Sequence, residues 1–194
     1  MMLQPKRVKS KKAVITSTIN APIKTIEIEV AIAKLFDVRK NIIVPNISWG
    51  LIGMHECDMF LIKKSGLAVE IEIKISKSDF MADLKKNHQH IDVQHRISEF
   101  YYAMPIDLID KCIDLIPEHA GIIVCERYLN YKKIEMVRAH IKRTPKKIKG
   151  ARKLTEAEQF RIARLGTMRI FTLKEKIIKE RKNGNSITKS SVKV

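Results

Sequence analysis

The stretch from Glu56 to Ile75 has an alternating pattern that restricts it to a β-hairpin with two unlike faces. Residues 58–63 and 67–75 are rich in strand-forming side chains, and Lys64-Ser65-Gly66 has the length and the glycine of a three-residue hairpin loop. Successive strand side chains point to opposite faces, so we expect one apolar and one charged face. The apolar face carries Cys57, Met59, Leu61, Leu67, Val69, Ile71, Ile73 and Ile75, and the charged face carries Glu56, Asp58, Phe60, Glu70, Glu72 and Lys74.

The charged face is expected to bind a cation. Pairing about Ser65 places Asp58 opposite Glu72, and carboxylates crowded on adjacent strands repel one another. Carboxylate oxygens are hard ligands, which suit Mg²⁺ or Mn²⁺ completed by water and phosphate oxygens. Glu70 and Glu56 are reserve ligands for a second ion, and Lys74 would face the attacking water or the phosphate. A solvated outer face is the alternative, but the apolar back of the second strand indicates a central strand in a covered sheet.

A helix predicted over residues 25–36 supplies a further acid. Helical angles place Glu29 between Ala33 and Phe36, within the predicted buried stripe, and Glu27 on the polar side. A buried carboxylate is costly unless it is paired or bound to a metal. We therefore prefer Glu29 over Glu27 as a site residue, although a helix start exposed to solvent could satisfy either acid.

These residues resemble the PD-(D/E)XK nuclease superfamily, which includes many restriction endonucleases and junction resolvases. The resemblance rests on Asp58 followed by Glu72-Ile73-Lys74, with an acid-bearing helix before them and a helix after them. The proline that often precedes the first acid is absent, since the chain reads His55-Glu56-Cys57-Asp58. Residues 72–80, 100–105 and 120–127 are similar to MmcB-like DNA repair proteins and to related phage and bacterial proteins. The resemblance implies a restriction-endonuclease-like core that cleaves DNA.

The order of elements predicts an α/β fold with a mixed central sheet flanked by helices and a C-terminal helix. Strands are expected over 41–49, 100–104 and 121–127, with helices over 76–88 and 106–115. We divide the chain into a basic arm (1–20), one nuclease-like domain (21–182) and a disordered tail (183–194). Within the domain lie a core (25–140), a flexible basic loop (142–153) and a helix (155–182). The stripe of Phe160, Ala163, Thr167, Ile170, Leu173 and Ile177 is expected to dock on the chain's own core or on a second copy.

The charge of the chain points to a polyanion as its partner. The formal net charge is +17 and the predicted pI is about 9.9. DNA is favoured over membrane because no apolar run approaches the length of a membrane span, and the basic N-terminus leads into no signal-peptide core. We expect a cytoplasmic protein. The three cysteines, Cys57, Cys112 and Cys125, lie in apolar contexts and are expected to be reduced core residues.

The candidate phosphate contacts fall in two groups. The first surrounds the predicted helix over 76–88, whose N-terminus offers free amides to an anion. The second is the basic loop, whose contacts would be blind to sequence. Simple helix capping and a solvated surface are the alternatives for the first group. The candidates are Ser76, Lys77, Ser78, Lys85, Lys86, His88, Arg96, Lys142, Arg143, Lys146, Lys147, Lys149 and Arg152.

Three functional hypotheses follow. In the first, the chain is a Mg²⁺-dependent deoxyribonuclease in DNA repair or in phage or mobile-element DNA processing, with Asp58, Glu72, Lys74 and Glu29 as catalytic residues. In the second, the same fold binds DNA without turnover. The third, a basic RNA-binding protein, explains the charge but not the acids, and few exposed aromatic residues are expected for base stacking. Cleavage of both strands would need two sites, which is consistent with a homodimer.

Overall fold

The computed structural model describes residues 21–47, 56–85 and 95–190, with the side chains of 183–190 outside that description. The arm (1–20), Trp49, Lys86 and His88 therefore lie outside the described residues. The elements in chain order are α1 (Thr25–Leu35), β1 (Ile42–Ile47), β2 (Cys57–Ile62), β3 (Ala68–Ile73), α2 (Lys77–Lys85), β4 (Ile97–Pro105), α3 (Ile106–Cys112), a 3₁₀ turn (Ile113–Leu115), β5 (Gly121–Leu129), β6 (Glu135–Arg143) and α4 (Glu156–Ser190).

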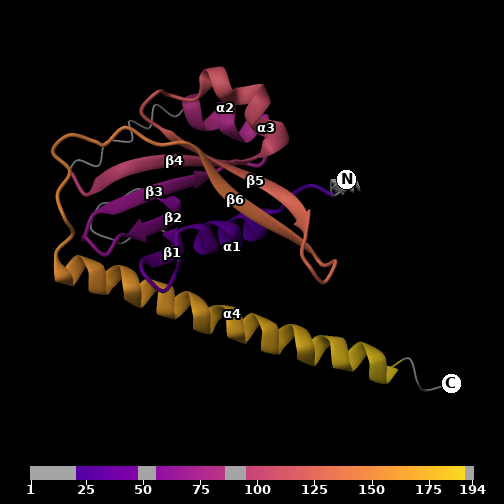
Figure 1. The fold of residues 1–194 in the computed structure, drawn as a ribbon. Coiled ribbons are helices and arrows are strands. Elements are labelled where there is room, and N and C mark those ends of the chain that lie inside the picture. Colours follow the sequence, from indigo (N-terminus) through magenta and orange to yellow (C-terminus); the bar gives the residue numbers. More distant parts are fainter. Residues whose placement is uncertain (1–20, 48–55, 86–94, 191–194) are drawn as a thin grey trace, which may run out of the picture.

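The strands form one mixed six-stranded sheet in the order β1-β2-β3-β4-β5-β6 (Figure 1). The pairs β1–β2, β2–β3 and β5–β6 are antiparallel, whereas β3–β4 and β4–β5 are parallel. Each parallel pair is joined by a crossover that contains a helix, as parallel strands require. The expected α/β fold with a mixed sheet, flanking helices and a C-terminal helix is confirmed.

The β2–β3 hairpin has the predicted register. Met59 pairs with Ile71 and Leu61 with Val69, which centres the hairpin on Ser65. Gly66 closes the turn with a left-handed φ of 84°, a conformation that favours glycine. Its amide donates a 2.8 Å hydrogen bond to the carbonyl of Lys63. The turn chemistry and the alternation of side chains therefore specify the same pairing.

The two faces of the sheet are covered by different helices. Helix α1 packs on one face, where Ile28 and Ile32 join Met59, Ile71 and other strand residues in one apolar cluster. Helices α2 and α3 cover the opposite face, where Phe80 and Ile109 pack with residues of β4 and β5. Figure 1 shows α1 on one side of the sheet and α2 and α3 on the other. The acid-bearing face of β2 and β3 is therefore the one that α2 approaches.

A third cluster joins the start of α4 to the first strands. Leu154 and Ile162 pack with Val44, Phe60 and neighbouring strand residues. Cys57 packs here and not with Met59, contrary to the face predicted for it. The nearby Asn46 has a φ of 53°, so β1 does not alternate regularly where it pairs with this end of β2. All three cysteines are buried and free, as expected.

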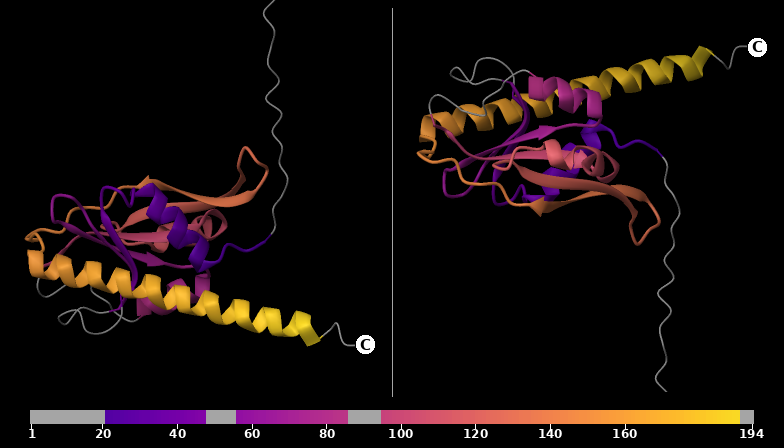
Figure 2. Two further views of the ribbon diagram at one scale, coloured as in Figure 1. Left: turned by 90° about the horizontal axis from the view of Figure 1, so that it is seen from below. Right: turned by 90° about the horizontal axis from the view of Figure 1, so that it is seen from above.

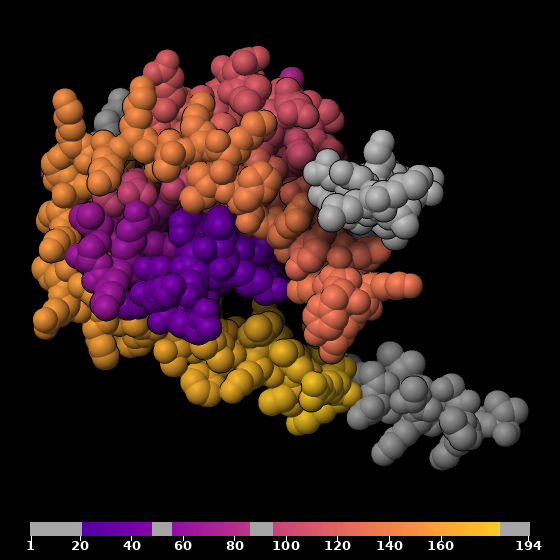
Figure 3. All heavy atoms as spheres, viewed as in Figure 1, coloured from indigo at the N-terminus to yellow at the C-terminus, as the bar shows by residue number. Residues whose placement is uncertain are grey.

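Helix α4 differs from its prediction in two ways. It runs to Ser190, beyond the predicted end at residue 182, and continues through Asn183-Gly184-Asn185, residues that commonly end a helix. It also docks on its own core through Ile162 and Leu165 and not through the predicted stripe. A Cβ on Gly166 would lie 3.2 Å from Val44, so this glycine lets α4 approach β1 closely. Figure 2 shows the outer half of α4 projecting past the rest of the domain, and Figure 3 shows α4 along the lower edge of the molecule.

The prediction of a flexible loop over residues 142–153 is wrong. Its first residues, Lys142 and Arg143, complete β6, a strand that was not predicted. The remaining segment is hydrogen-bonded to the start of β4 and to the residue before it. The Ile148 amide donates to the Ser98 carbonyl and the Arg152 amide to the His95 carbonyl, at 2.9 and 2.7 Å. These backbone hydrogen bonds fix the segment as a strap between β6 and α4. None of the helices in the described part of the chain is both long and apolar enough to cross a membrane.

Candidate active site

Asp58 and Glu72 lie on neighbouring strands at one end of the sheet. The β2–β3 register, with Met59 opposite Ile71, brings the position of Asp58 level with Glu72. The backbone pairing of β2 with β3 ends at Met59 and Ile71. Beyond it, the Ile73 amide donates a 2.7 Å hydrogen bond to the side-chain Oδ2 of Asp58. This bond holds one oxygen of Asp58 against β3 and leaves the other available for a ligand.

Lys74, directly after β3, forms two ion pairs in a nearly buried setting. Its ammonium donates to Oε2 of Glu72 at 3.0 Å and lies 3.2 Å from Oδ1 of Asp83, a residue of α2. The side chains of Lys74, Glu72 and Asp83 are only 7, 13 and 11% exposed. Asp83 is held in turn by the hydroxyl of Tyr102, which donates to Oδ2 at 3.0 Å. The lysine is thus fixed between a strand and a helix.

The carboxylates retain protons more readily than free acids do. Burial, followed by the charge of Asp58, raises the pKa of Glu72 to about 7. Burial also raises the pKa of Asp58, opposed by the Ile73 hydrogen bond and by Lys74. Burial lowers the pKa of Lys74, but the charges of Glu72 and Asp83 outweigh it and the net shift is upward. The site holds more negative charge than Lys74 can balance, so a cation would stabilise it.

Glu29 reaches the same end of the sheet from α1. Asn46 of β1 donates a 3.1 Å hydrogen bond to its Oε1. Burial raises the pKa of Glu29, and the negative charge of Asp58 adds to the shift, which places the two acids within electrostatic reach. Glu27 points elsewhere, because Arg127 donates to both of its oxygens at 2.9 and 3.0 Å.

The buried stripe of α1 is not where the sequence analysis placed it. The buried residues of α1 are Ile28, Ala31 and Ile32, and Ile26 is 58% exposed. Glu29 therefore borders the buried stripe and does not occupy its centre. Of the reserve ligands, Glu70 is buried two residues before Glu72, and its charge adds to the raised pKa of Glu72, whereas Glu56 is exposed before β2.

Three further side chains belong to this site and were missed. They are Asp83, Tyr102 and Asn46, which hold Lys74 and Glu29 as described above. Asp83 follows the buried Phe80 by three residues, so helical spacing alone puts it on the sheet-facing side of α2. For Tyr102 and Asn46 the sequence holds no comparable signal, because their contacts depend on how elements cross.

The donor set fits a hard divalent ion, although it is not a closed cage. Among the described residues, no group of three or more His, Cys, Asp or Glu side chains is arranged to hold a metal ion. Asp58 and Glu72 supply two carboxylates, with Glu29 nearby. Mg²⁺ and Mn²⁺ are commonly held by one or two carboxylates and completed by water and phosphate oxygens. The residues present suit such an open site.

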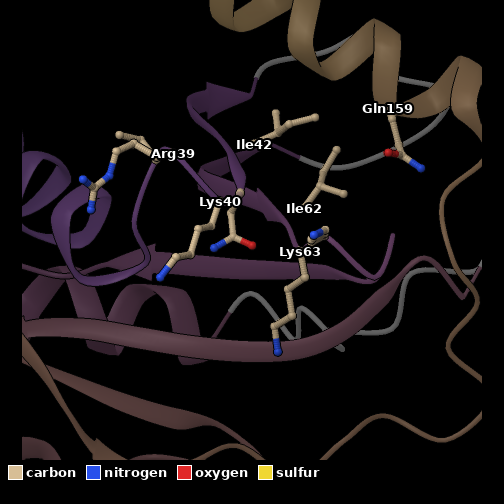
Figure 4. A pocket seen from close by; sticks show the side chains of 9 residues that line it. Arg39, Lys40, Ile42, Ile62, Lys63 and Gln159 are labelled. Carbon is tan, nitrogen blue, oxygen red and sulfur yellow. The ribbon is translucent and has the colours of Figure 1, made fainter.

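A hollow of about 330 Å³ lies at the opposite end of β2 and does not include the acids (Figure 4). Arg39, Lys40 and Lys63 line it, together with Ile42, Ile62 and Gln159. Lys63 is paired with Glu99 at 2.6 Å, and Arg39 with Asp37 at 2.9 Å. Asp58 is five residues before Lys63, or about 17 Å along the strand. This hollow is therefore separate from the candidate site.

The predicted phosphate contacts divide into available and occupied side chains. Arg96 is buried at 1% exposure, so that prediction is wrong. The guanidinium of Arg143 is also occupied within the fold, because it donates hydrogen bonds to the carbonyls of Ile116, Pro117 and Ala120. Lys146 and Arg152 pair with Glu118 and Glu158, at 2.7 and 2.6 Å. Among the described candidates, the lysines that are exposed and have no ion pair with a described residue are Lys77, Lys85, Lys142, Lys147 and Lys149.

Ser76 and Ser78 act locally at the start of α2. The hydroxyl of Ser76 accepts a 3.1 Å hydrogen bond from the Asp79 amide and lies 3.0 Å from that of Ser78. Ser76 therefore caps the helix, which is the alternative considered for it, whereas Ser78 lies inside the first turn of α2. Asp79 and Asp83 also raise the pKa of Asp58, so this end of α2 adds negative charge to the site.

Comparison with known proteins supports the fold alone. A scan of family models and a search of curated proteins gave no match. Among solved structures, the chain is similar to the SPO1766 protein of unknown function from Silicibacter pomeroyi, with a TM-score of 0.51 and 15% identity over 78% of this chain and 88% of that one. At this identity the likeness concerns the architecture, which is a mixed α/β sheet flanked by helices.

Proposed function

We propose that this protein is a metal-dependent DNA endonuclease. The observation that carries the proposal is the grouping of Asp58, Glu72 and Lys74 at one sheet end, with Lys74 3.0 Å from Glu72. Two carboxylates that can hold a metal ion and an ammonium beside them are groups that can support phosphodiester hydrolysis. The same grouping supports the resemblance to the PD-(D/E)XK nucleases, and the net charge of +17 favours a nucleic acid as the substrate.

Each residue has a defined part in this proposal. Asp58 and Glu72 would hold Mg²⁺ or Mn²⁺, which when bound supplies positive charge to the phosphate and acidifies a water molecule. Lys74, held as an ammonium by Glu72 and Asp83, orients the attacking water and steadies charge in the transition state. Asp83 is a positioning residue, because it holds the ammonium of Lys74 against β3. Glu29 supports the site from α1.

The biological setting follows from the same reasoning. We place the protein in the cytoplasm and assign it to DNA repair or to the processing of phage or mobile-element DNA, on the resemblance to MmcB-like proteins. Cleavage of both strands would use two copies of the chain.

A DNA-binding protein without turnover is the second candidate. It is favoured by the ion pairs of Lys74, whose ammonium is already engaged by both Glu72 and Asp83. The described residues also form no group of three or more side chains that could hold a metal ion. In this case the basic surface would bind DNA while the acids remained inactive. The two candidates make the same prediction for binding and opposite predictions for cleavage.

The test is incubation of the purified protein with supercoiled, linear, nicked and branched DNA, with Mg²⁺, Mn²⁺ or a chelator. The variants are Asp58→Ala and Lys74→Ala, with Lys64→Ala as a matched control at the exposed turn of the same hairpin. The nuclease proposal expects metal-dependent cutting by the wild type and Lys64→Ala, and binding without cutting by the other two. Binding without cutting by all four proteins would support the second candidate, and a strong preference for RNA would contradict both.

A further inference from the structure

The β5–β6 hairpin ends in an exposed aromatic side chain. Tyr131 is 90% exposed, the highest value among the large apolar and aromatic side chains that the structure describes. Ile134 and Leu129 beside it are 55 and 43% exposed. Figure 1 and both views of Figure 2 show this hairpin tip projecting away from the sheet. The sequence argument expected few exposed aromatic residues, and Tyr131 is one that the described part of the chain does expose.

The tip is a preorganised turn. Oδ1 of Asn130 accepts hydrogen bonds from the amides of Lys132 and Ile134, at 2.9 and 3.0 Å. The Asn130 amide donates to the Ile134 carbonyl, and the Lys133 amide donates to the Asn130 carbonyl, at 3.0 and 2.9 Å. Four hydrogen bonds around one asparagine fix the backbone that presents Tyr131. A partner that contacts the ring therefore loses little affinity to ordering of the loop.

The side chains around Tyr131 match a nucleotide. The ammonium of Lys132 lies 5.6 Å from the ring centroid, and Lys133 is exposed next to it. A ring for stacking on a base and cations for the adjoining phosphates are the two components of single-strand recognition. A lipid surface or a protein groove would use the ring as well, but the paired lysines and the basic chain favour a nucleic acid.

The tip lies beyond the same end of the sheet as the candidate site. In the parallel strands, Glu72 is level with Tyr102, and Tyr102 with Ile122. Leu129 lies seven residues further along β5, which is about 23 Å of extended chain. The base of the hairpin is tied to α1, since Arg127 donates to Glu27 and to the carbonyls of Ala21 and Pro22. Helix α1 also carries Glu29, so the tip and the site share one rigid support.

We propose that the β5–β6 tip is a base-stacking element that selects DNA in which unpaired bases adjoin a duplex. The ring of Tyr131 can stack only on a base whose face is open, and bases inside a duplex are covered by their neighbours. The path from Glu72 to the ring crosses two strand spacings and then follows more than about 23 Å of β5, which corresponds to several nucleotide steps along one strand. The substrate class is therefore forked or flapped DNA, with the unpaired segment several nucleotides from the cleaved bond. This inference rests on the proposed function and names its substrate.

The test measures binding in a chelator, so that cleavage plays no part. The probes are a duplex ending in two unpaired arms, with the fluorescent base 2-aminopurine in one arm, and a blunt duplex of the same sequence. We expect the wild type to bind the fork more tightly and to quench the fluorescent base. Tyr131→Ala should lower affinity for the fork about tenfold and leave the blunt duplex unchanged, whereas Tyr131→Trp should keep the preference.

Phe171→Ala is the matched control, because Phe171 is 59% exposed on α4 with the ammonium of Lys174 5.4 Å from its ring centroid. Its fork preference should equal that of the wild type. An equal loss on fork and blunt duplex in Tyr131→Ala, or a wild type that does not prefer the fork, would overturn the inference. A protein that never cuts but shows the Tyr131-dependent preference contradicts only the nuclease proposal. One that cuts without this preference contradicts only the stacking role.

Discussion

The β2–β3 hairpin and the outer part of α4 depart in opposite ways from the usual distribution of side chains. In the hairpin, the ion-paired Glu72 and Lys74 are 13 and 7% exposed. On α4, the apolar Phe171 and Leu173 are 59 and 53% exposed. Buried charges raise the free energy of the folded state unless a partner compensates them. Exposed apolar groups have little effect on the stability of the isolated chain, because folding does not remove them from water.

Neither region is explained by the stability of the fold alone. The hairpin lies in the middle of the core and still carries charge, so its acids are retained at the expense of stability. The outer part of α4 contributes to neither core nor site in the described chain. We therefore expect mutations in the hairpin and mutations in the outer part of α4 to differ in their effects on stability and on ligand binding.

The largest effect should come from the inner face of α4. Ile162→Ala removes a fully buried side chain and should lower the free energy of unfolding by about 3 kcal/mol. Ile170→Ala, two turns further along the same helix and 55% exposed, should change it by less than about 0.5 kcal/mol. Urea denaturation of both variants measures the difference. Equal losses would mean that the outer stripe is also part of the folded core.

The second effect concerns the pH dependence of the hairpin. The pKa of Glu72 is raised to about 7, so its contribution to stability is present at low pH and is lost as the pH rises from its ordinary value towards 7. In a chelator at pH 8, Glu72→Gln should be more stable than the wild type by about 1–3 kcal/mol. Thermal unfolding between pH 5 and about pH 8 measures this. The exposed Glu56→Gln is the control, and a Glu72→Gln variant less stable at pH 8 would contradict the account.

A smaller effect of opposite sign is expected at the start of α4. Arg152 and Thr155 lower the pKa of Glu158 to about 2, so its contribution is present near neutrality and is lost as the pH falls through that value. Arg152 is 39% exposed, so we expect Glu158→Gln to lose only about 1 kcal/mol at pH 7. The loss should shrink on acidification. The exposed Glu156→Gln should show neither change in the same urea titrations.

The smallest effects should come from the strap over 144–153. Lys147 and Lys149 are exposed, so replacing either with Ala should weaken DNA binding regardless of sequence. The slope of log affinity against log salt should fall by about one for each lysine. Lys146→Ala should change it less, because Glu118 already pairs with that ammonium at 2.7 Å. A titration in fluorescence anisotropy at several salt concentrations would show identical slopes if the strap does not touch DNA.

The sequence predicts the hairpin well because two independent signals agree there. Alternation of period two and a glycine at the turn both specify the pairing that places Asp58 level with Glu72. The mixed sheet with flanking helices follows from the order of elements. The strand β6 was not predicted, although Val137, Ala139 and Ile141 alternate with polar residues. Its last two residues, Lys142 and Arg143, were assigned to a basic loop.

Other predictions failed where the packing between helices and strands decides which side chains are buried or in contact. Asp83 joins Lys74 only because α2 lies across the face of β3 and β4. Arg96 is buried, and no local pattern in the sequence separates it from exposed arginines. The docking face of α4 was assigned to the wrong stripe, since Ile162 and Phe160 are both apolar and only their contacts distinguish them.

The central claim is that Asp58 and Glu72 together hold a catalytic cation. The most direct measurement is a Mn²⁺ titration followed by electron paramagnetic resonance, with a non-hydrolysable phosphorothioate duplex present. Wild type and Glu56→Gln should bind Mn²⁺ alike, while Asp58→Asn and Glu72→Gln should each lose that binding. Equal binding by all four proteins, or no binding by the wild type, would contradict the account.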